Sequence, residues 1–230
     1  MSSTSPESNA AVDTEAHPFT KVAPAMEGAA EFASQYSGER GEAALYHEHY
    51  PTAKKTMWIR PVDPAHDTEI ITKWMNLKHV VPYWKMDWPP EKIRKYLDDM
   101  QERPGFECFI TYMDEEPFGY LEMYDPTRDR LAECYDAKND DGGLHIMIGE
   151  EKYLKKFIIR LSITVLRFVF VHWPEAPRAV GEPDEQNKQV LGLMRFLGFR
   201  FLRKINFPEK VADLLTLTRE DFQRGHGNRV

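Results

Sequence analysis

The sequence predicts a mixed α/β domain in which helices flank one central sheet. Two strand-like segments, 106–113 and 118–124, surround an acidic turn and predict an antiparallel hairpin. Strand-like and helix-like segments then alternate through the second half of the chain. Within Tyr153–Trp173, apolar residues recur every three or four positions, which predicts a helix with one buried face. This order predicts a sheet with both antiparallel and parallel neighbours.

The 230-residue chain is predicted to contain one folded domain after a polar extension. Residues 1–50 are rich in Ser, Ala, Glu, Gly and Pro and show no repeating apolar face, so we expect a disordered or loosely packed N-terminal extension. Residues 51–230 form the expected domain. The hydrophobic fraction of 42% is enough to build a sizeable core.

The predicted domain begins with a strand and two helices. Met57–Pro61 is the strand, and Asp67 is expected to cap the helix that follows it. His79–Trp88 is an aromatic loop. The second helix, Glu91–Glu102, opens after two prolines, which the first helical turn tolerates because its N–H groups have no helical partners.

The second half of the domain is predicted to alternate strands and helices. A polar loop over 125–142 leads to a strand at Gly143–Gly149, which feeds the long helix. A short strand at Arg178–Glu182 ends at Pro183. The remaining elements are a helix at 186–197, capped by Asp184 or Glu185 and stopped by Gly198, and closing strands at 199–206 and 214–218.

Composition argues against several classes of function. With 37 acidic and 30 basic residues, the net charge of −7 disfavours a nucleic-acid partner. The two cysteines lack metal-binding spacing, so we expect free thiols and no metal site. No basic and apolar signal segment opens the sequence, and four basic residues interrupt the longest apolar run, so we expect a cytoplasmic protein without a membrane span.

Six short segments carry the functional signal because they occur together in one order. They are WMN (74–76), GYLEMY (119–124), DGGLHIMIG (141–149), GEPDEQN (181–187), GF (198–199) and PEK (208–210). This order resembles the siderophore N-acyltransferases of aerobactin, alcaligin and mycobactin assembly, which are members of the GNAT acetyltransferase superfamily. The resemblance extends from about Trp58 to Phe222.

The resemblance implies a GNAT fold, in which one strand splays from its neighbour and acyl-CoA lies in the gap. Here the splayed strand is Leu144–Gly149, so Ile146, Met147 and Ile148 are the expected contacts of the acyl-CoA arm. The turn after Gly149 lacks the glycines usual in related enzymes. We therefore expect side chains to contact the pyrophosphate, and Asn187 is either a helix-surface residue or a contact to the arm. The lysines proposed for the phosphates are Lys152, Lys155 and Lys156.

His145 and Asp184 are the predicted catalytic residues. The resemblance implies that His145 binds substrate or relays protons, and that Asp184 is a general base. An unperturbed histidine titrates near neutral pH, which suits proton transfer. The alternatives are a histidine with purely structural contacts within the sheet and an aspartate that only caps the next helix.

Four further residues are predicted to line an acceptor pocket. They are His79, Trp84, Glu122 and Tyr124. The aromatic residues have packing as the alternative role, and Glu122 has the alternative of a solvated strand carboxylate. Lys210 is either a surface residue or a partner for a substrate carboxylate or a CoA phosphate.

The resulting functional expectation is acyl transfer from acetyl-CoA or succinyl-CoA to a hydroxylated amine. N-hydroxylysine, N-hydroxycadaverine and N-hydroxyputrescine are the expected acceptors, and the product is a hydroxamate that binds iron. A hydroxylase and a synthetase of a siderophore pathway are the expected partners. Two alternatives stay open: a GNAT-fold binding or regulatory module without catalysis, and an N-acetyltransferase of antibiotics or proteins.

Overall fold

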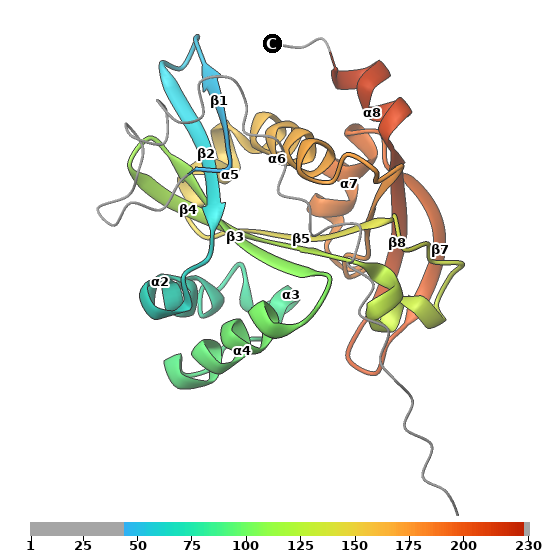
Figure 1. The fold of residues 1–230 in the computed structure, drawn as a ribbon, viewed down its shortest axis with the longest axis horizontal. Coiled ribbons are helices and arrows are strands. Elements are labelled where there is room, and N and C mark those ends of the chain that lie inside the picture. Colours follow the sequence, from blue (N-terminus) through green and yellow to red (C-terminus); the bar gives the residue numbers. More distant parts are fainter. Residues whose placement is uncertain (1–43, 228–230) are drawn as a thin grey trace, which may run out of the picture.

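The computed structural model describes residues 44–227, which form an eight-stranded sheet with helices on both faces (Figure 1). The strand order is β1-β2-β3-β4-β5-β6-β8-β7. All neighbouring strands are antiparallel except β5 and β6, which are parallel. The predicted mixed α/β fold is confirmed. Within residues 44–227, no helix combines the length and apolar character needed to cross a membrane.

The sheet begins before the predicted first strand. β1 (Tyr46–Tyr50) pairs with β2 (Lys55–Pro61), and both terminal tyrosines of β1 are buried. The Tyr50 hydroxyl lies 2.7 Å from Thr164 Oγ1, which ties β1 to the core. The sheet therefore includes residues that the sequence assigned to the extension. The rest of that extension, residues 1–43, lies outside the described residues.

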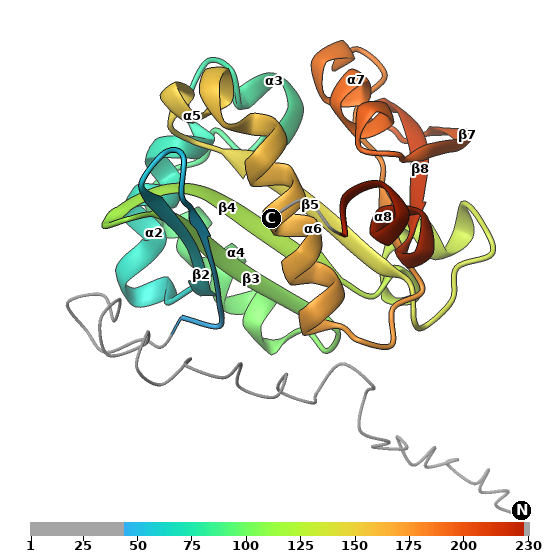
Figure 2. The same ribbon diagram turned by 90° about the horizontal axis from the view of Figure 1, so that it is seen from above.

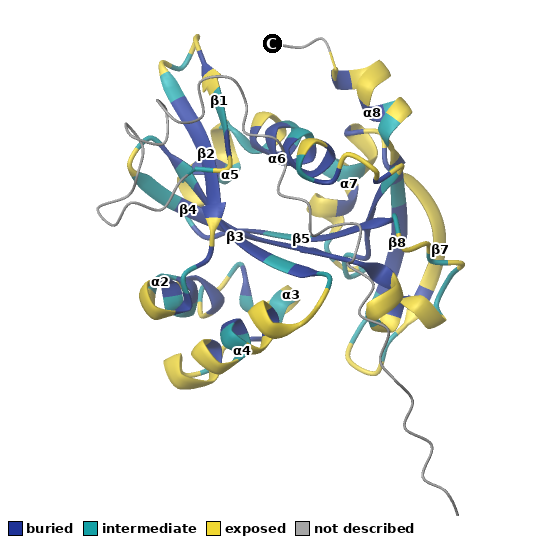
Figure 3. Ribbon diagram, viewed as in Figure 1, coloured by how far each residue is buried: buried dark blue, intermediate teal, exposed yellow. Residues whose placement is uncertain are grey.

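The predicted hairpin forms the centre of the sheet. β3 (Phe106–Met113) and β4 (Glu116–Tyr124) pair with each other, and β5 (Gly142–Ile148) lies beside β4. These strands are largely buried (Figure 3) because helices cover both faces. One face carries α2 (Pro64–Met75), α3 (Val81–Trp84) and α4 (Pro90–Glu102).

Two predicted helices differ from the structure, one in its N-terminal cap and the other in its continuity. Asp63, not Asp67, caps α2, and the buried Asp67 instead accepts hydrogen bonds of 2.7 and 2.8 Å from the Arg60 guanidinium. The predicted long helix is interrupted at Phe157, whose φ of −124° lies outside the helical range. It is divided into α5 (Glu151–Lys156) and α6 (Ile158–His172). Figure 2 shows α6 crossing the second face of the sheet.

The C-terminal part completes the sheet beyond β6. Two 3₁₀ turns, η2 (Pro126–Arg128) and η3 (Arg130–Glu133), lie in the polar loop before β5. The edge strand β7 is mostly exposed (Figure 3), and the helix α8 was not predicted from the sequence. The remaining elements are β6 (Arg178–Gly181), α7 (Lys188–Phe196), β7 (Arg200–Asn206), β8 (Val211–Thr218) and α8 (Arg219–His226).

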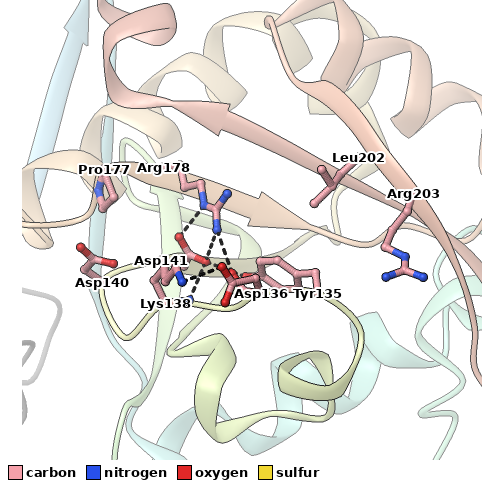
Figure 4. Close-up of a pocket in the computed structure, with 9 residues that line it drawn as sticks. All are labelled: Tyr135, Asp136, Lys138, Asp140, Asp141, Pro177, Arg178, Leu202 and Arg203. Atoms are coloured by element: carbon pink, nitrogen blue, oxygen red, sulfur yellow. Dashed lines mark hydrogen bonds and ion pairs between the residues drawn. The ribbon is translucent and has the colours of Figure 1, made fainter.

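A buried ion pair holds the beginnings of β5 and β6 together. Arg178 donates from Nε and a terminal nitrogen to the two carboxylate oxygens of Asp141, at 2.5 and 2.8 Å (Figure 4). The Tyr135 hydroxyl donates to the same carboxylate at 2.9 Å. Asp141 is fully buried, and its carboxylate joins the beginnings of the two strands. The pocket in Figure 4 adjoins this pair.

Candidate active site

β5 and β6 separate soon after the Asp141–Arg178 ion pair. The chain after β6 stays with β8, because Asp184 forms a bridge with Ala212. From Leu144 onward, β5 has no strand partner on this side among the described residues. The two strands pair at only two positions, Gly142 with Ala179 and Gly143 with Val180.

The backbone of β5 offers hydrogen-bonding groups toward the side that β6 has left. The Gly149 N–H donates to the Phe118 carbonyl at 2.8 Å. This bond shows which residues of β5 direct their backbone hydrogen bonds toward β4. Bonded positions alternate in an antiparallel pair, so His145 and Met147 direct their backbone groups toward β4. The backbone N–H and C=O groups of Leu144, Ile146 and Ile148 therefore point away from β4, toward the side that β6 has left.

His145 lies where the strands separate, with both ring nitrogens against carboxylates. Nδ1 is 2.9 Å from Glu122 Oε2, and Nε2 is 2.9 Å from Glu182 Oε1. The glutamate side chains are 4% and 3% exposed, whereas the imidazole is 36% exposed. A carboxylate oxygen accepts, so both ring nitrogens must carry a proton for both contacts to be hydrogen bonds. The geometry therefore selects the imidazolium form.

Each carboxylate of this cluster has further partners that hold it in place. Glu122 Oε1 accepts from the hydroxyls of Tyr96 and Tyr120, at 2.6 and 2.9 Å. Glu182 Oε2 accepts from the Tyr124 hydroxyl at 3.1 Å, and its backbone carbonyl accepts from Lys210 Nζ at 2.9 Å. The glutamates are fixed in position and cannot rotate freely toward solvent.

The cluster changes the acid–base behaviour of its members. Burial alone lowers the pKa of His145, but the charge of Glu182 and hydrogen bonds from both glutamates outweigh it and raise the pKa to about 10. Burial alone raises the pKa of Glu182, but the His145 charge and hydrogen bond, with Lys210 and Tyr124, hold that pKa well below its usual range. At neutral pH the ring is charged and Glu182 is a poor proton acceptor.

Three of the four predicted pocket residues, Trp84, Glu122 and Tyr124, belong to this cluster, and one lies elsewhere. The Tyr124 ring packs on the His145 ring with centroids 4.9 Å apart, and the Trp84 ring meets it edge-on at 6.1 Å. His79 instead donates from Nε2 to the Ile148 carbonyl at 3.0 Å, and its Nδ1 is 3.3 Å from Glu151. It thus lies at the far end of β5, beside the start of α5.

The remaining predicted site residues have local roles in the structure. Asp184 Oδ1 accepts from the Gln186 backbone N–H at 2.8 Å, whereas the carboxylates on the His145 ring are those of Glu122 and Glu182. Asn187, and not Asp184 or Glu185 as predicted, caps α7 by accepting from the Val190 N–H. Of the lysines proposed for the phosphates, Lys155 and Lys156 are exposed near the end of α5, and Lys152 pairs with Glu116.

Sequence reasoning missed the role of Glu182 and the contacts made by the turn at 207–210. Glu182 lies in the GEPDEQN segment, but Asp184, two residues further on, was chosen because the family resemblance implies a general base there. Lys210, predicted to be either a surface residue or a partner of a substrate carboxylate or CoA phosphate, has a side chain that is only 14% exposed and pairs with Glu182. The adjacent Glu209 accepts from Arg130 at 2.5 Å and, through its carbonyl, from Lys85 at 2.6 Å. The turn therefore connects η3, α3 and the His145 cluster.

Comparison with known proteins identifies the family of the chain. The model of the acetyltransferase (GNAT) domain matches residues 63–207. The chain belongs to the GNAT acetyltransferase family. Residues 63–207 of this GNAT protein include β5, the strand that separates from β6, and both glutamates that bind His145.

Curated relatives of this GNAT protein include the N-hydroxyputrescine acetyltransferase of Acinetobacter baumannii. It is 31% identical over 73% of this chain and 81% of the relative. The N(6)-hydroxylysine O-acetyltransferase of Escherichia coli is 24% identical over 80% of this chain and 58% of its own length. An aminoglycoside acetyltransferase bound to coenzyme A shares the fold, with a TM-score of 0.65 and 20% identity over 73% of this chain and 98% of its own.

Proposed function

We propose that this protein transfers an acyl group from acyl-CoA to the hydroxylated nitrogen of a small amine, which forms a hydroxamate. The observation that carries the proposal is the separation of β5 from β6, with the His145 cluster at its edge. Relatives named for N-hydroxyputrescine and N(6)-hydroxylysine support this acceptor class. The proposed setting is cytoplasmic siderophore synthesis, between a hydroxylase and a synthetase.

The chain supplies binding and electrostatic stabilisation in the proposed reaction. Bound acyl-CoA supplies an activated thioester. The outward N–H groups of Ile146 and Ile148 are placed to donate to the thioester oxygen, where negative charge develops. The aromatic rings of Trp84 and Tyr124 border the imidazolium, and we assign them to the acceptor side. No covalent protein intermediate is part of this proposal.

Release of free CoA tests the proposed function. Acetyl-CoA and succinyl-CoA are each offered with N-hydroxylysine, N-hydroxycadaverine and N-hydroxyputrescine, with the parent amines and an aminoglycoside as controls. Hydroxamate formation with at least one hydroxylated amine, faster than with its parent, is expected. Transfer only to unhydroxylated amines or to the drug contradicts the proposed acceptor class.

A second candidate is a GNAT-fold binding module without catalysis, which the start of α5 favours. Glu150 accepts there from Lys73 at 2.9 Å, and Glu151 lies beside His79. These carboxylates stand where the family resemblance places the pyrophosphate, and like charges repel. Calorimetry with acetyl-CoA separates the candidates, because the absence of binding at millimolar ligand contradicts the enzyme and favours the module.

A further inference from the structure

The ring of His145 has no free nitrogen in this structure. Glu122 and Glu182 each lie 2.9 Å from one ring nitrogen, so both N–H groups are engaged. A histidine that accepts a proton needs one unprotonated nitrogen directed at the donor. Neither nitrogen meets this requirement while the two carboxylates stay in place.

We infer that His145 stays an imidazolium throughout turnover, clamped by Glu122 and Glu182, and that the site therefore selects acceptors whose nitrogen is already neutral. The inference rests on the proposed function and deepens it by naming the property that defines the acceptor. A hydroxylated amine has this property near neutral pH, because hydroxylation makes the nitrogen much less basic. An alkylamine, with a pKa near about 10.4, is almost entirely protonated and has no lone pair for attack.

The other charged and titratable groups around His145 do not supply a substitute base. Tyr124 on β4 donates its hydroxyl to Glu182, and Lys210 in the turn before β8 donates to the same residue. Tyr96 on α4 and Tyr120 on β4 both donate to Glu122. The α3 residue that contacts the ring, Trp84, does not titrate. Both carboxylates are thus occupied by donors.

The chemical step balances without a base in the cluster. The lone pair of the neutral nitrogen forms the new C–N bond to the thioester carbon. The C–S bond breaks, and its electron pair leaves on sulfur. The proton released from nitrogen ends on that thiolate, so the products are a hydroxamate and CoA with a free thiol. The step needs no oxidant or reductant, and His145 contributes a fixed positive charge.

Nuclear magnetic resonance of the full chain with ¹⁵N-labelled histidine tests the imidazolium directly. We expect both ring nitrogens of His145 to be protonated at about pH 8, well above the usual histidine pKa. The signal is assigned by its loss in His145→Gln. In Glu182→Gln the pKa of His145 should fall by at least about one unit, because one charge partner is lost. One unprotonated ring nitrogen in the wild type at about pH 8 overturns the inference.

A matched control uses a second histidine–glutamate pair outside the site. His172 Nε2 lies 2.9 Å from Glu107, so Glu107→Gln removes an equivalent contact. This variant should leave the His145 signal unchanged, which separates loss of the clamp from a general effect of losing a carboxylate.

Rates with paired acceptors separate failure of the inference from failure of the proposed function. Below the pKa of the parent amine, kcat/KM for that amine should rise about tenfold per pH unit, because its neutral fraction does. The hydroxylated acceptor should show a level profile between about pH 7.5 and 9. If both acceptors react and the ratio of their kcat/KM values does not change with pH, the inference is overturned but the proposed function stands. Absence of transfer to either acceptor, with the imidazolium intact, overturns the proposed function and the selectivity built on it.

Discussion

The two ends of the β5–β6 pair use ionic groups in opposite ways. At the paired end, the fully buried Asp141 binds Arg178 through two hydrogen bonds that join the strands. At the separated end, His145 binds two glutamates, but its ring remains 36% exposed. The first arrangement brings two strands together, and the second presents a charge where they part. The ionic groups at the two ends of this strand pair therefore differ: one carboxylate is enclosed between the strands, and one charged ring stays partly open to solvent.

The largest expected effect comes from removing the charge at the separated end. His145→Ala should lower kcat/KM for a hydroxylated acceptor by about 100-fold or more, which is typical of losing a group that acts on the transition state. The melting temperature should change much less than the rate. Steady-state kinetics with calorimetric melting measures both. An unchanged rate removes His145 from the proposed site.

The paired end should show the reverse response. Asp141→Ala leaves the Arg178 guanidinium without its carboxylate, and removing one partner of a buried pair is strongly destabilising. Because Arg178 is 27% exposed, water partly replaces the lost partner, and we expect a loss of about 2 kcal/mol in the free energy of unfolding. For a domain of this size, that lowers the melting temperature by about 4–8 °C.

Two measurements check this prediction. Denaturant unfolding gives the stability of Asp141→Ala, and steady-state kinetics well below its melting temperature gives its activity. Near-normal kcat/KM with reduced stability is the expected combination. A variant that keeps wild-type stability shows that the ion pair is not what holds the two strands together.

The stability of the separated end should depend on alkaline pH. The pKa of His145 rises from 6.5 to about 10 on folding, so its stabilising contribution is complete below about pH 6.5 and is lost as pH approaches 10. The melting-temperature difference between wild type and His145→Gln should therefore shrink as pH rises through this range. Lysines titrate in both proteins, so their contribution to the pH dependence cancels in the difference. A constant difference contradicts the raised pKa.

The smallest expected effect concerns Asp184. Its carboxylate accepts the Gln186 N–H, and an asparagine oxygen keeps that bond while removing the charge. Since the account needs no base there, Asp184→Asn should reduce kcat by less than about tenfold. A loss of about 100-fold or more instead supports the general base predicted from the family resemblance.

The sequence predicted the central elements because their patterns are local. The β3–β4 hairpin and α4 were placed within a few residues by alternation and helical spacing. β1 was missed because its two buried tyrosines lie four residues apart among polar neighbours. The interruption at Phe157 was missed because no proline or glycine lies there to predict a break in the helix.

The site was predicted less completely because its partners are distant along the chain. His145, Glu122 and Tyr124 were all named, since they lie in recognisable segments. Glu182 is 37 residues from His145, and only strand pairing brings it to the ring. Spacing alone does not distinguish Glu182 from Asp184, because residues two apart in an extended chain face the same way.

A crystal structure with bound CoA is the decisive test of where the acyl carrier lies. We expect the pantetheine arm along the β6-facing side of Leu144–Ile148, with its sulfur close to His145. The Glu122 and Glu182 carboxylates should still bind both ring nitrogens. CoA bound elsewhere, or side chains filling the space between β5 and the segment after β6 at saturating CoA, would contradict the account.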